Sequence, residues 1–109
     1  MDGTTDITRT YPLGPLTEDE KRFYTWTLQS HIDLAKAVWL DYCECKMIDT
    51  IAREPLWRHL INYRCGTGHS VSFVGNVHEG PHALNGRNTI RMRPGMVVTD
   101  EPGVYETDL

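Results

Sequence analysis

Side chains able to hold a divalent cation fall in four short segments, each beside a glycine or a proline. These segments are residues 5–10, 66–69, 76–82 and 99–103. In each, a polar side chain lies within or at the end of an apolar run, where a carboxylate is costly unless it is paired, hydrogen-bonded or bound to a cation. Carboxylate and imidazole ligands together suit divalent metals of intermediate hardness. Asp6, His69 and Glu101 would form such a set, with coordination positions left for water and substrate.

Each of these side chains also has an interpretation that needs no metal. Asp6 could cap a turn, His69 could be a loop histidine, and Glu101 precedes a proline that extends its backbone, which could turn it to solvent. His78 and His82 flank a Glu-Gly-Pro turn, and an exposed turn explains both without catalysis. Residue types alone therefore indicate a candidate metal site and no more.

Two helices are expected to support these segments. Thr17 and Glu20 form a capping box that should begin a helix ending at about Trp39 or Leu40. Its apolar stripe would contain Phe23, Trp26, Ser30, Leu34, Ala37 and Val38. A shorter helix should run from Lys46 to about Trp57, with Met47, Ile48, Ile51 and Ala52 facing inward and a kink or early end at Pro55. His31 and His59 lie in helical stretches and are expected to be structural or surface residues.

The rest of the chain is predicted to form strands. Residues 4–11 are rich in β-branched side chains, and residues 96–99 follow a Pro-Gly turn. Glycines punctuate the region after residue 62, as in strands joined by tight turns. The order of strand, two helices and several strands predicts an α+β or α/β arrangement in one pair of layers. The strands at both ends lack a partner, so we expect that sequence is missing there.

The composition excludes some classes of function. The chain has 109 residues, enough for one domain, and a net charge of −4, which argues against a nucleic-acid partner. No apolar run approaches the roughly 20 residues that cross a bilayer, and no N-terminal signal is present, so we expect no membrane partner and a cytoplasmic location. Three cysteines cannot all pair within one chain, which favours free thiols.

Together the four segments resemble one family, the pita-bread metallopeptidases, and within it the Xaa-Pro aminopeptidases. Residues 3–10 resemble the strand bearing a metal-binding aspartate, 66–69 the segment of the ligand histidine, 76–81 the substrate-side histidine loop, and 94–105 the strand and turn of a ligand glutamate. The resemblance implies an α+β fold that is part of a pita-bread fold, with an antiparallel curved sheet and two helices packed on one face. Residues 1–109 would be a partial C-terminal catalytic domain, truncated at both ends.

The resemblance also implies a role for each site residue. Asp6 would bridge two metals, His69 and Glu101 would be ligands, and Glu101 would also shuttle protons. His78 would hold the substrate near the scissile bond, and Cys65 stands where the family usually has a substrate-side histidine. Family members use two divalent ions, commonly manganese, with cobalt and zinc as alternatives here. They act on peptides with proline at the second position, and two cations would activate a bridging water at neutral pH.

This sequence departs from the family pattern in two missing ligands and in two substituted positions. An earlier aspartate and a later glutamate of the family have no counterpart in it, so we expect a second cation to bind weakly or not at all. The chain alone should therefore hydrolyse peptides poorly. A thiol at Cys65 cannot replace the imidazole donor at neutral pH, and Ser70 stands where glycine is usual.

Other functions remain open at this point. The chain could be a non-catalytic pita-bread relative that binds peptides or proteins, or a hydrolase of the Xaa-Pro dipeptidase or creatinase kind. Exposed sheet edges would favour a homo-oligomer.

Overall fold

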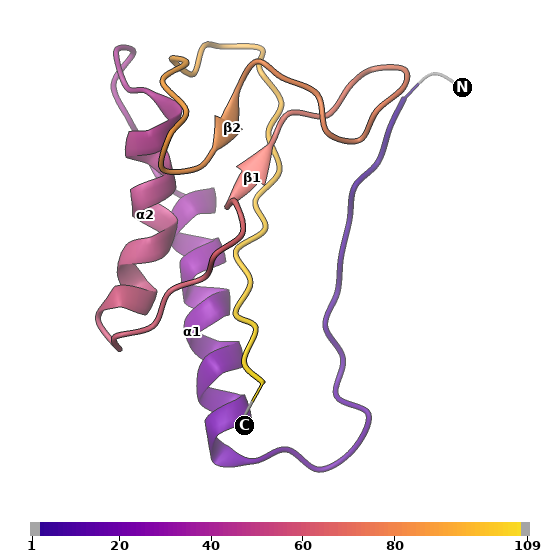
Figure 1. Ribbon diagram of the computed structural model, residues 1–109, viewed down its shortest axis with the longest axis vertical. Coiled ribbons are helices and arrows are strands. Elements are labelled where there is room, and N and C mark those ends of the chain that lie inside the picture. The colour runs from indigo at the N-terminus through magenta and orange to yellow at the C-terminus, as the bar shows by residue number, and fades with distance from the viewer. Residues whose placement is uncertain (1–2, 108–109) are drawn as a thin grey trace.

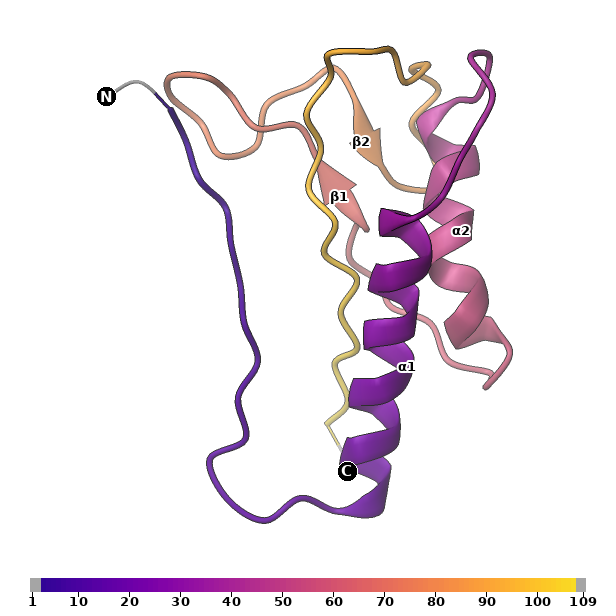
Figure 2. The ribbon, with the colours of Figure 1, turned by 180° about the vertical axis from the view of Figure 1, so that it is seen from behind.

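A computed structural model describes residues 3–107, with two helices followed by a small sheet. The elements are α1 (Glu18–Ala35), α2 (Cys45–Trp57), β1 (Gly68–His69) and β2 (Ala83–Leu84). β1 and β2 are antiparallel, with Gly68 opposite Leu84 and His69 opposite Ala83. α1 and α2 form an antiparallel helical hairpin that lies on one side of the two strands (Figures 1 and 2).

The predicted capping box begins α1, and the helix ends earlier than predicted. Thr17 Oγ1 accepts a hydrogen bond from the Glu20 amide at 3.2 Å, and Glu20 Oε2 accepts one from the Thr17 amide at 2.9 Å. The predicted end at residue 39 or 40 is wrong, because the chain leaves the helix after Ala35 and packs the half-buried Trp39 against the core. Val38, predicted to face inward, is 94% exposed for the same reason.

α2 follows its prediction closely, except at Pro55. Pro55 is buried, and the helix continues to Trp57 without the early end that a proline predicts. Within the last turn, proline costs the backbone hydrogen bond that its own amide would have made. Ile48 and Ala52 face inward as predicted, whereas Met47 is 45% exposed.

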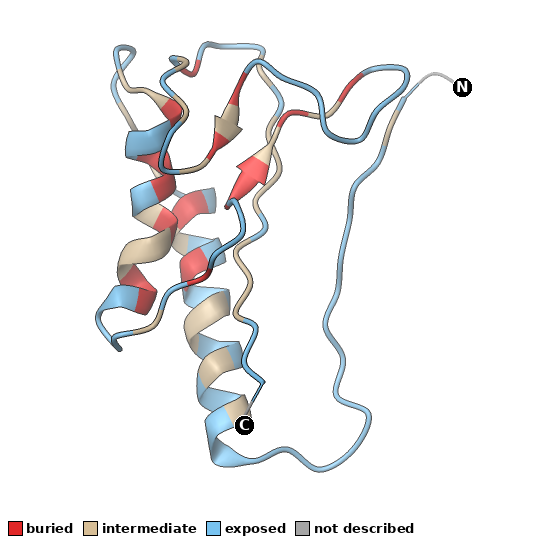
Figure 3. Cartoon of the chain, in the orientation of Figure 1, coloured by how far each residue is buried: buried red, intermediate tan, exposed pale blue. Residues whose placement is uncertain are grey.

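The sheet is smaller than predicted. Residues 4–11 are extended, but no backbone hydrogen bond joins them to any other part of residues 3–107, so the predicted strand is wrong. Figure 3 shows this N-terminal arm, residues 3–16, exposed along almost its whole length. Residues 97–101 are also extended and lie beside β1, where the Thr99 amide donates to the His69 carbonyl at 2.9 Å and the Glu101 amide donates to the Thr67 carbonyl at 2.8 Å.

The core lies between the helical hairpin and the strands. Its buried members are Leu34, Cys45, Ile48, Ala52, Leu84 and Met92. Because these residues come from α1, α2, β2 and the loop that follows, burial of their apolar surface fixes the helices against the strands.

Among the described residues, neither helix combines the length and the apolar character that a membrane crossing requires.

Candidate metal centre

The structure brings Asp6, His69 and Glu101 together, although the first and the last are 95 positions apart in the chain. His69 Nε2 lies 3.1 Å from Asp6 Oδ2 and 2.7 Å from Glu101 Oε1. One ligating atom from each residue lies within 4.8 Å of the other two. The arm supplies Asp6, β1 supplies His69, and the extended segment beside β1 supplies Glu101. The predicted set of two carboxylates and one imidazole therefore converges in space.

The orientation of His69 suits a cation among the three side chains. Its Nδ1 lies 3.0 Å from the Ser70 carbonyl oxygen, an arrangement in which Nδ1–H donates and Nε2 presents a lone pair. Nε2 is buried and has no hydrogen-bond partner among the described residues, although both carboxylates lie within ion-pair distance of it. A lone pair beside two carboxylates is unfavourable unless a positive charge lies between them. These donors therefore fit a divalent cation.

A close backbone approach sets the distance between His69 and Glu101. A Cβ added at Gly68 would lie 1.9 Å from the Thr99 carbonyl oxygen, so this position requires glycine. Thr99 Oγ1 accepts from the His69 amide at 2.9 Å and donates to Glu101 Oε1 at 2.9 Å. One threonine thereby orients both a ligand strand and a ligand side chain.

A buried polar network supports the segment that leads into β1, and the sequence interpretation missed it. Asp49 on α2 accepts from Arg53 Nε at 2.8 Å and from the Thr67 hydroxyl. Arg53 also donates to the carbonyl oxygens of Tyr63 at 2.6 Å and Cys65 at 2.9 Å. An Asp and an Arg four residues apart, on the inward side of a helix, are the signal that could have revealed this network.

The pKa of Tyr63 is changed by its place in this buried network. Burial raises the pKa of Tyr63, while its hydrogen bond with Thr67 and the nearby Arg53 charge act in the opposite direction.

The remaining predicted residues lie at different distances from the centre. The His78 ring packs against the His69 ring, with centroids 3.9 Å apart and planes at 45°. Cys65 is exposed, and its Sγ lies 3.9 Å from the Gly103 carbonyl oxygen, to which the thiol can donate a weak hydrogen bond. His82 was expected in an exposed turn, but it is 6% exposed, so that expectation is wrong. Its Nε2 is hydrogen-bonded to the Val97 carbonyl oxygen at 2.8 Å.

The centre opens on a groove of about 1720 Å³. The arm forms one wall, and residues 97–105 with the exposed side of α1 form the other. Asp6 and Glu101 both line it, so a molecule in the groove would reach these two carboxylates.

Comparisons of sequence place these features in a known family. The family model described as metallopeptidase family M24 matches residues 1–108. A probable Xaa-Pro aminopeptidase P from Laccaria bicolor is 45% identical over 108 residues, which are 96% of this chain and 17% of that protein. Aminopeptidase P1 from Lotus japonicus is 45% identical over 107 residues, 97% of this chain and 16% of that protein. The chain thus spans about a sixth of the length of these curated relatives.

Solved structures agree with the sequence comparisons. X-prolyl aminopeptidase from Caenorhabditis elegans, described as a cytosolic enzyme with a dinuclear active site, matches 96% of this chain and 17% of its own, with a TM-score of 0.90 and 38% identity. Xaa-Pro dipeptidase from Bacillus anthracis matches 96% of this chain and 29% of its own, with a TM-score of 0.85 and 26% identity. These similarities confirm the predicted α+β class and the resemblance to part of a pita-bread fold. The chain belongs to metallopeptidase family M24.

Proposed function

We propose that these residues are part of the catalytic domain of a metal-dependent aminopeptidase that removes an N-terminal residue preceding proline. The observation that carries this proposal is the convergence of Asp6, His69 and Glu101 at the edge of a groove. The similarity to Xaa-Pro aminopeptidases over nearly the whole chain supports the choice of substrate class.

Each donor has a role that its surroundings support. His69 offers Nε2, because the Ser70 carbonyl holds Nδ1–H. Asp6 and Glu101 supply negative charge on either side of that nitrogen. A bound divalent cation would polarise the scissile carbonyl and activate water at neutral pH. Glu101 also provides a carboxylate that can take up and return a proton beside the reacting group.

Two further residues would face the substrate. The His78 ring touches the His69 ring, which brings its nitrogens to the border of the centre, where one can donate a hydrogen bond to the substrate. Cys65 would lie on the substrate side where relatives of the family carry an imidazole, and its thiol is a weak donor. We propose manganese as the resident ion, with cobalt and zinc as the alternatives that the donor set also accepts.

The three donors form one cation site, and we propose one tightly bound divalent ion for this stretch of 109 residues. The Caenorhabditis elegans relative is described as having a dinuclear active site. A second ion should bind these residues weakly, because all three donors are already assigned to the first. The 109 residues alone should therefore turn over peptide far more slowly than a full-length protein that contains them.

Titration calorimetry with manganese, cobalt and zinc salts tests the centre. We expect one site in the wild type, loss of binding in His69→Ala, and unchanged binding in His59→Ala, since His59 stacks on Trp26 with centroids 3.8 Å apart and has no part in the centre. Binding that persists in His69→Ala would show that the centre is placed wrongly.

The activity needs a separate assay on the full-length protein that contains these residues. With an Xaa-Pro-Xaa tripeptide as substrate, we expect metal-dependent release of the first residue. Absence of release with all three metals would reject the aminopeptidase. Faster cleavage of an Xaa-Pro dipeptide than of the tripeptide would instead favour a dipeptidase, the activity named for the Bacillus anthracis relative.

A second candidate is a non-catalytic relative that binds peptides in the groove. The observation that favours it is the exposed thiol of Cys65 at a position where an imidazole donor is expected. Peptide binding without any metal binding would select this function.

We propose a cytoplasmic location, which agrees with the description of the Caenorhabditis elegans relative as cytosolic. We also propose that the partners of this chain are peptides rather than nucleic acids or membranes, in keeping with its net charge of −4. The unpaired backbone of residues 4–11 provides an edge at which two copies could associate, which light scattering would detect.

A further inference from the structure

His31 on α1 contacts the segment that carries Glu101. Its Nδ1 lies 3.2 Å from the Asp100 carbonyl oxygen, to which it can donate a hydrogen bond, and 3.1 Å from Asp100 Oδ1. The two residues are 69 positions apart in the chain. The contact therefore ties the C-terminal part of α1 to the residue directly before a candidate metal ligand.

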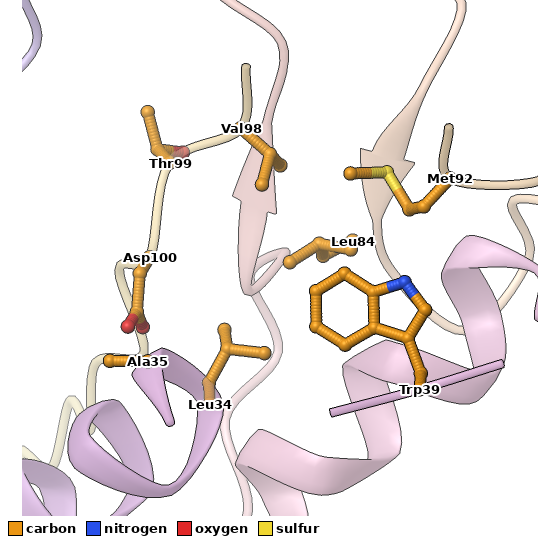
Figure 4. A pocket seen from close by; sticks show the side chains of 8 residues that line it. All are labelled: Leu34, Ala35, Trp39, Leu84, Met92, Val98, Thr99 and Asp100. Carbon is orange, nitrogen blue, oxygen red and sulfur yellow. The ribbon is translucent and has the colours of Figure 1, made fainter. Parts of the chain in front are cut away.

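Asp100 and Glu101 point to opposite sides of the extended segment, as neighbouring residues of a strand do. The Asp100 carboxylate borders a pocket of about 240 Å³ on the side of α1, where it lies beside Ala35 (Figure 4). Glu101 faces His69 on the other side. Because the two residues are consecutive, a shift of the Asp100 backbone relative to α1 is passed on to Glu101 and changes its position relative to His69.

The Asp100 carboxylate has few polar partners apart from His31. Both of its oxygens are buried and lack a hydrogen bond from the described residues, although Oδ1 is within ion-pair distance of His31. The other walls of the pocket are mainly apolar and include Leu34, Trp39 and Val98. His31 is thus the polar contact that α1 offers to this residue.

We propose that His31 is a positioning residue for the candidate metal centre: by holding the Asp100 main chain against α1, it sets the position of Glu101 beside His69. His31 itself does not touch the donor atoms, and its effect passes through two backbone bonds. The Glu101 amide, which donates to the Thr67 carbonyl at 2.8 Å, reports that position directly. As far as it concerns metal affinity, this inference rests on the proposed function; the position of Glu101 does not depend on a metal.

Two substitutions at residue 31 separate the hydrogen bond from the bulk of the ring. In His31→Asn, the side-chain amide nitrogen takes nearly the place of Nδ1 and can donate to the Asp100 carbonyl. In His31→Leu, no donor remains. His59→Leu is the matched control, because it removes a second histidine that packs on α1, through Trp26, without contacting residues 97–101.

The first measurement is amide hydrogen exchange of the metal-free protein by NMR. We expect the Glu101 amide to exchange about tenfold faster in His31→Leu, and near the wild-type rate in His31→Asn and His59→Leu. Equal acceleration in His59→Leu would mean that general loosening is responsible. An unchanged Glu101 rate in His31→Leu would overturn the proposal whether or not the protein binds metal.

The second measurement is manganese affinity by calorimetry, with thermal unfolding recorded for every variant. We expect about tenfold weaker binding in His31→Leu and recovery in His31→Asn, as for other supports of metal ligands. Wild-type protein that binds no manganese would refute the proposed centre and leave the exchange result to decide the role of His31. If His31→Leu bound manganese as tightly as the wild type while His69→Ala bound none, the role of His31 would be overturned and the proposed centre would stand.

Discussion

Replacement of Gly68 by alanine tests whether the close approach of β1 and residues 97–101 holds the candidate metal centre together. The new Cβ would lie 1.9 Å from the Thr99 carbonyl oxygen and 2.9 Å from its carbonyl carbon. Real Cβ atoms essentially never come within 3.0 Å of another atom, so the two segments must separate by about 1.1 Å, from 1.9 to 3.0 Å. Both obstructing atoms belong to the backbone and cannot rotate away.

That separation breaks the hydrogen bonds that join the two segments. These bonds run from the His69 amide to Thr99 Oγ1 at 2.9 Å, from the Thr99 amide to the His69 carbonyl at 2.9 Å, and from the Glu101 amide to the Thr67 carbonyl at 2.8 Å. Each contributes about 1 kcal/mol net, and overpacking adds a cost of about 1–3 kcal/mol. We expect Gly68→Ala to lower the free energy of unfolding by about 4–6 kcal/mol, a large part of the stability of a small domain. Manganese affinity should fall more than about tenfold, because the displaced segments carry two of the ligands.

Urea unfolding followed by tryptophan fluorescence gives the stability, and calorimetry gives the affinity. Gly86→Ala is the control, since nothing lies within 4 Å of a Cβ added at that position. The control should stay within about 0.5 kcal/mol of the wild type, as surface substitutions usually do. Gly68→Ala with the stability of the control and unchanged manganese affinity would refute the reasoning that this glycine sets the geometry of the centre.

Three further predictions concern the support of the site. Asp49→Ala removes the carboxylate that pairs with Arg53 and leaves a charged guanidinium bonded to uncharged oxygens alone. Because the Asp49 and Arg53 side chains are 3% and 11% exposed, the free energy of unfolding should drop by about 3–5 kcal/mol in urea titrations; a loss below about 1 kcal/mol would contradict this. Thr17→Ala removes the capping box of α1 and should cost about 1 kcal/mol, seen as a lower thermal midpoint by circular dichroism. Because burial raises the pKa of Tyr63 above its ordinary 10.0, the unfolded chain loses this proton first, so stability should fall as the pH rises above about 10. Tyr63→Phe should lose less stability than the wild type between about pH 9 and about pH 10.5, and equal losses would argue against this cause.

The start of α1 was predicted correctly from the sequence, because local hydrogen bonds of the capping box fix it. Thr17 and Glu20 satisfy each other's backbone amides, so the start of α1 needs no tertiary contact. The end of α1 was not predictable in the same way. Ala37, Val38 and Trp39 continue the helical pattern, but the helix ends at Ala35 and Trp39 packs, half-buried, against the core from a non-helical backbone. A tertiary contact of this kind is not encoded in the helical periodicity.

The site was predictable as a set of residue types, and its geometry depended on contacts that no local pattern encodes. Asp6, His69 and Glu101 were each ambiguous alone, and they became a candidate centre only through the combined resemblance of four segments. The supports were not foreseen, because each joins two different segments. Arg53 binds the carbonyl oxygens of Tyr63 and Cys65 in the loop after α2, and His31 contacts Asp100, 69 positions away. Such pairings depend on the register of the packed elements, which a single sequence does not specify.

The N-terminal arm has a consequence for how the centre gains its third donor. Asp6 reaches His69 on an exposed segment whose backbone makes no hydrogen bond to the rest of residues 3–107. The arm therefore acts as a tether, and its carboxylate behaves as a covalently attached ligand at a high effective concentration. Proteolytic cleavage near Leu13, which is fully exposed, would turn Asp6 into part of a separate peptide. The two remaining donors would then lose the high effective concentration that the covalent link gives to Asp6.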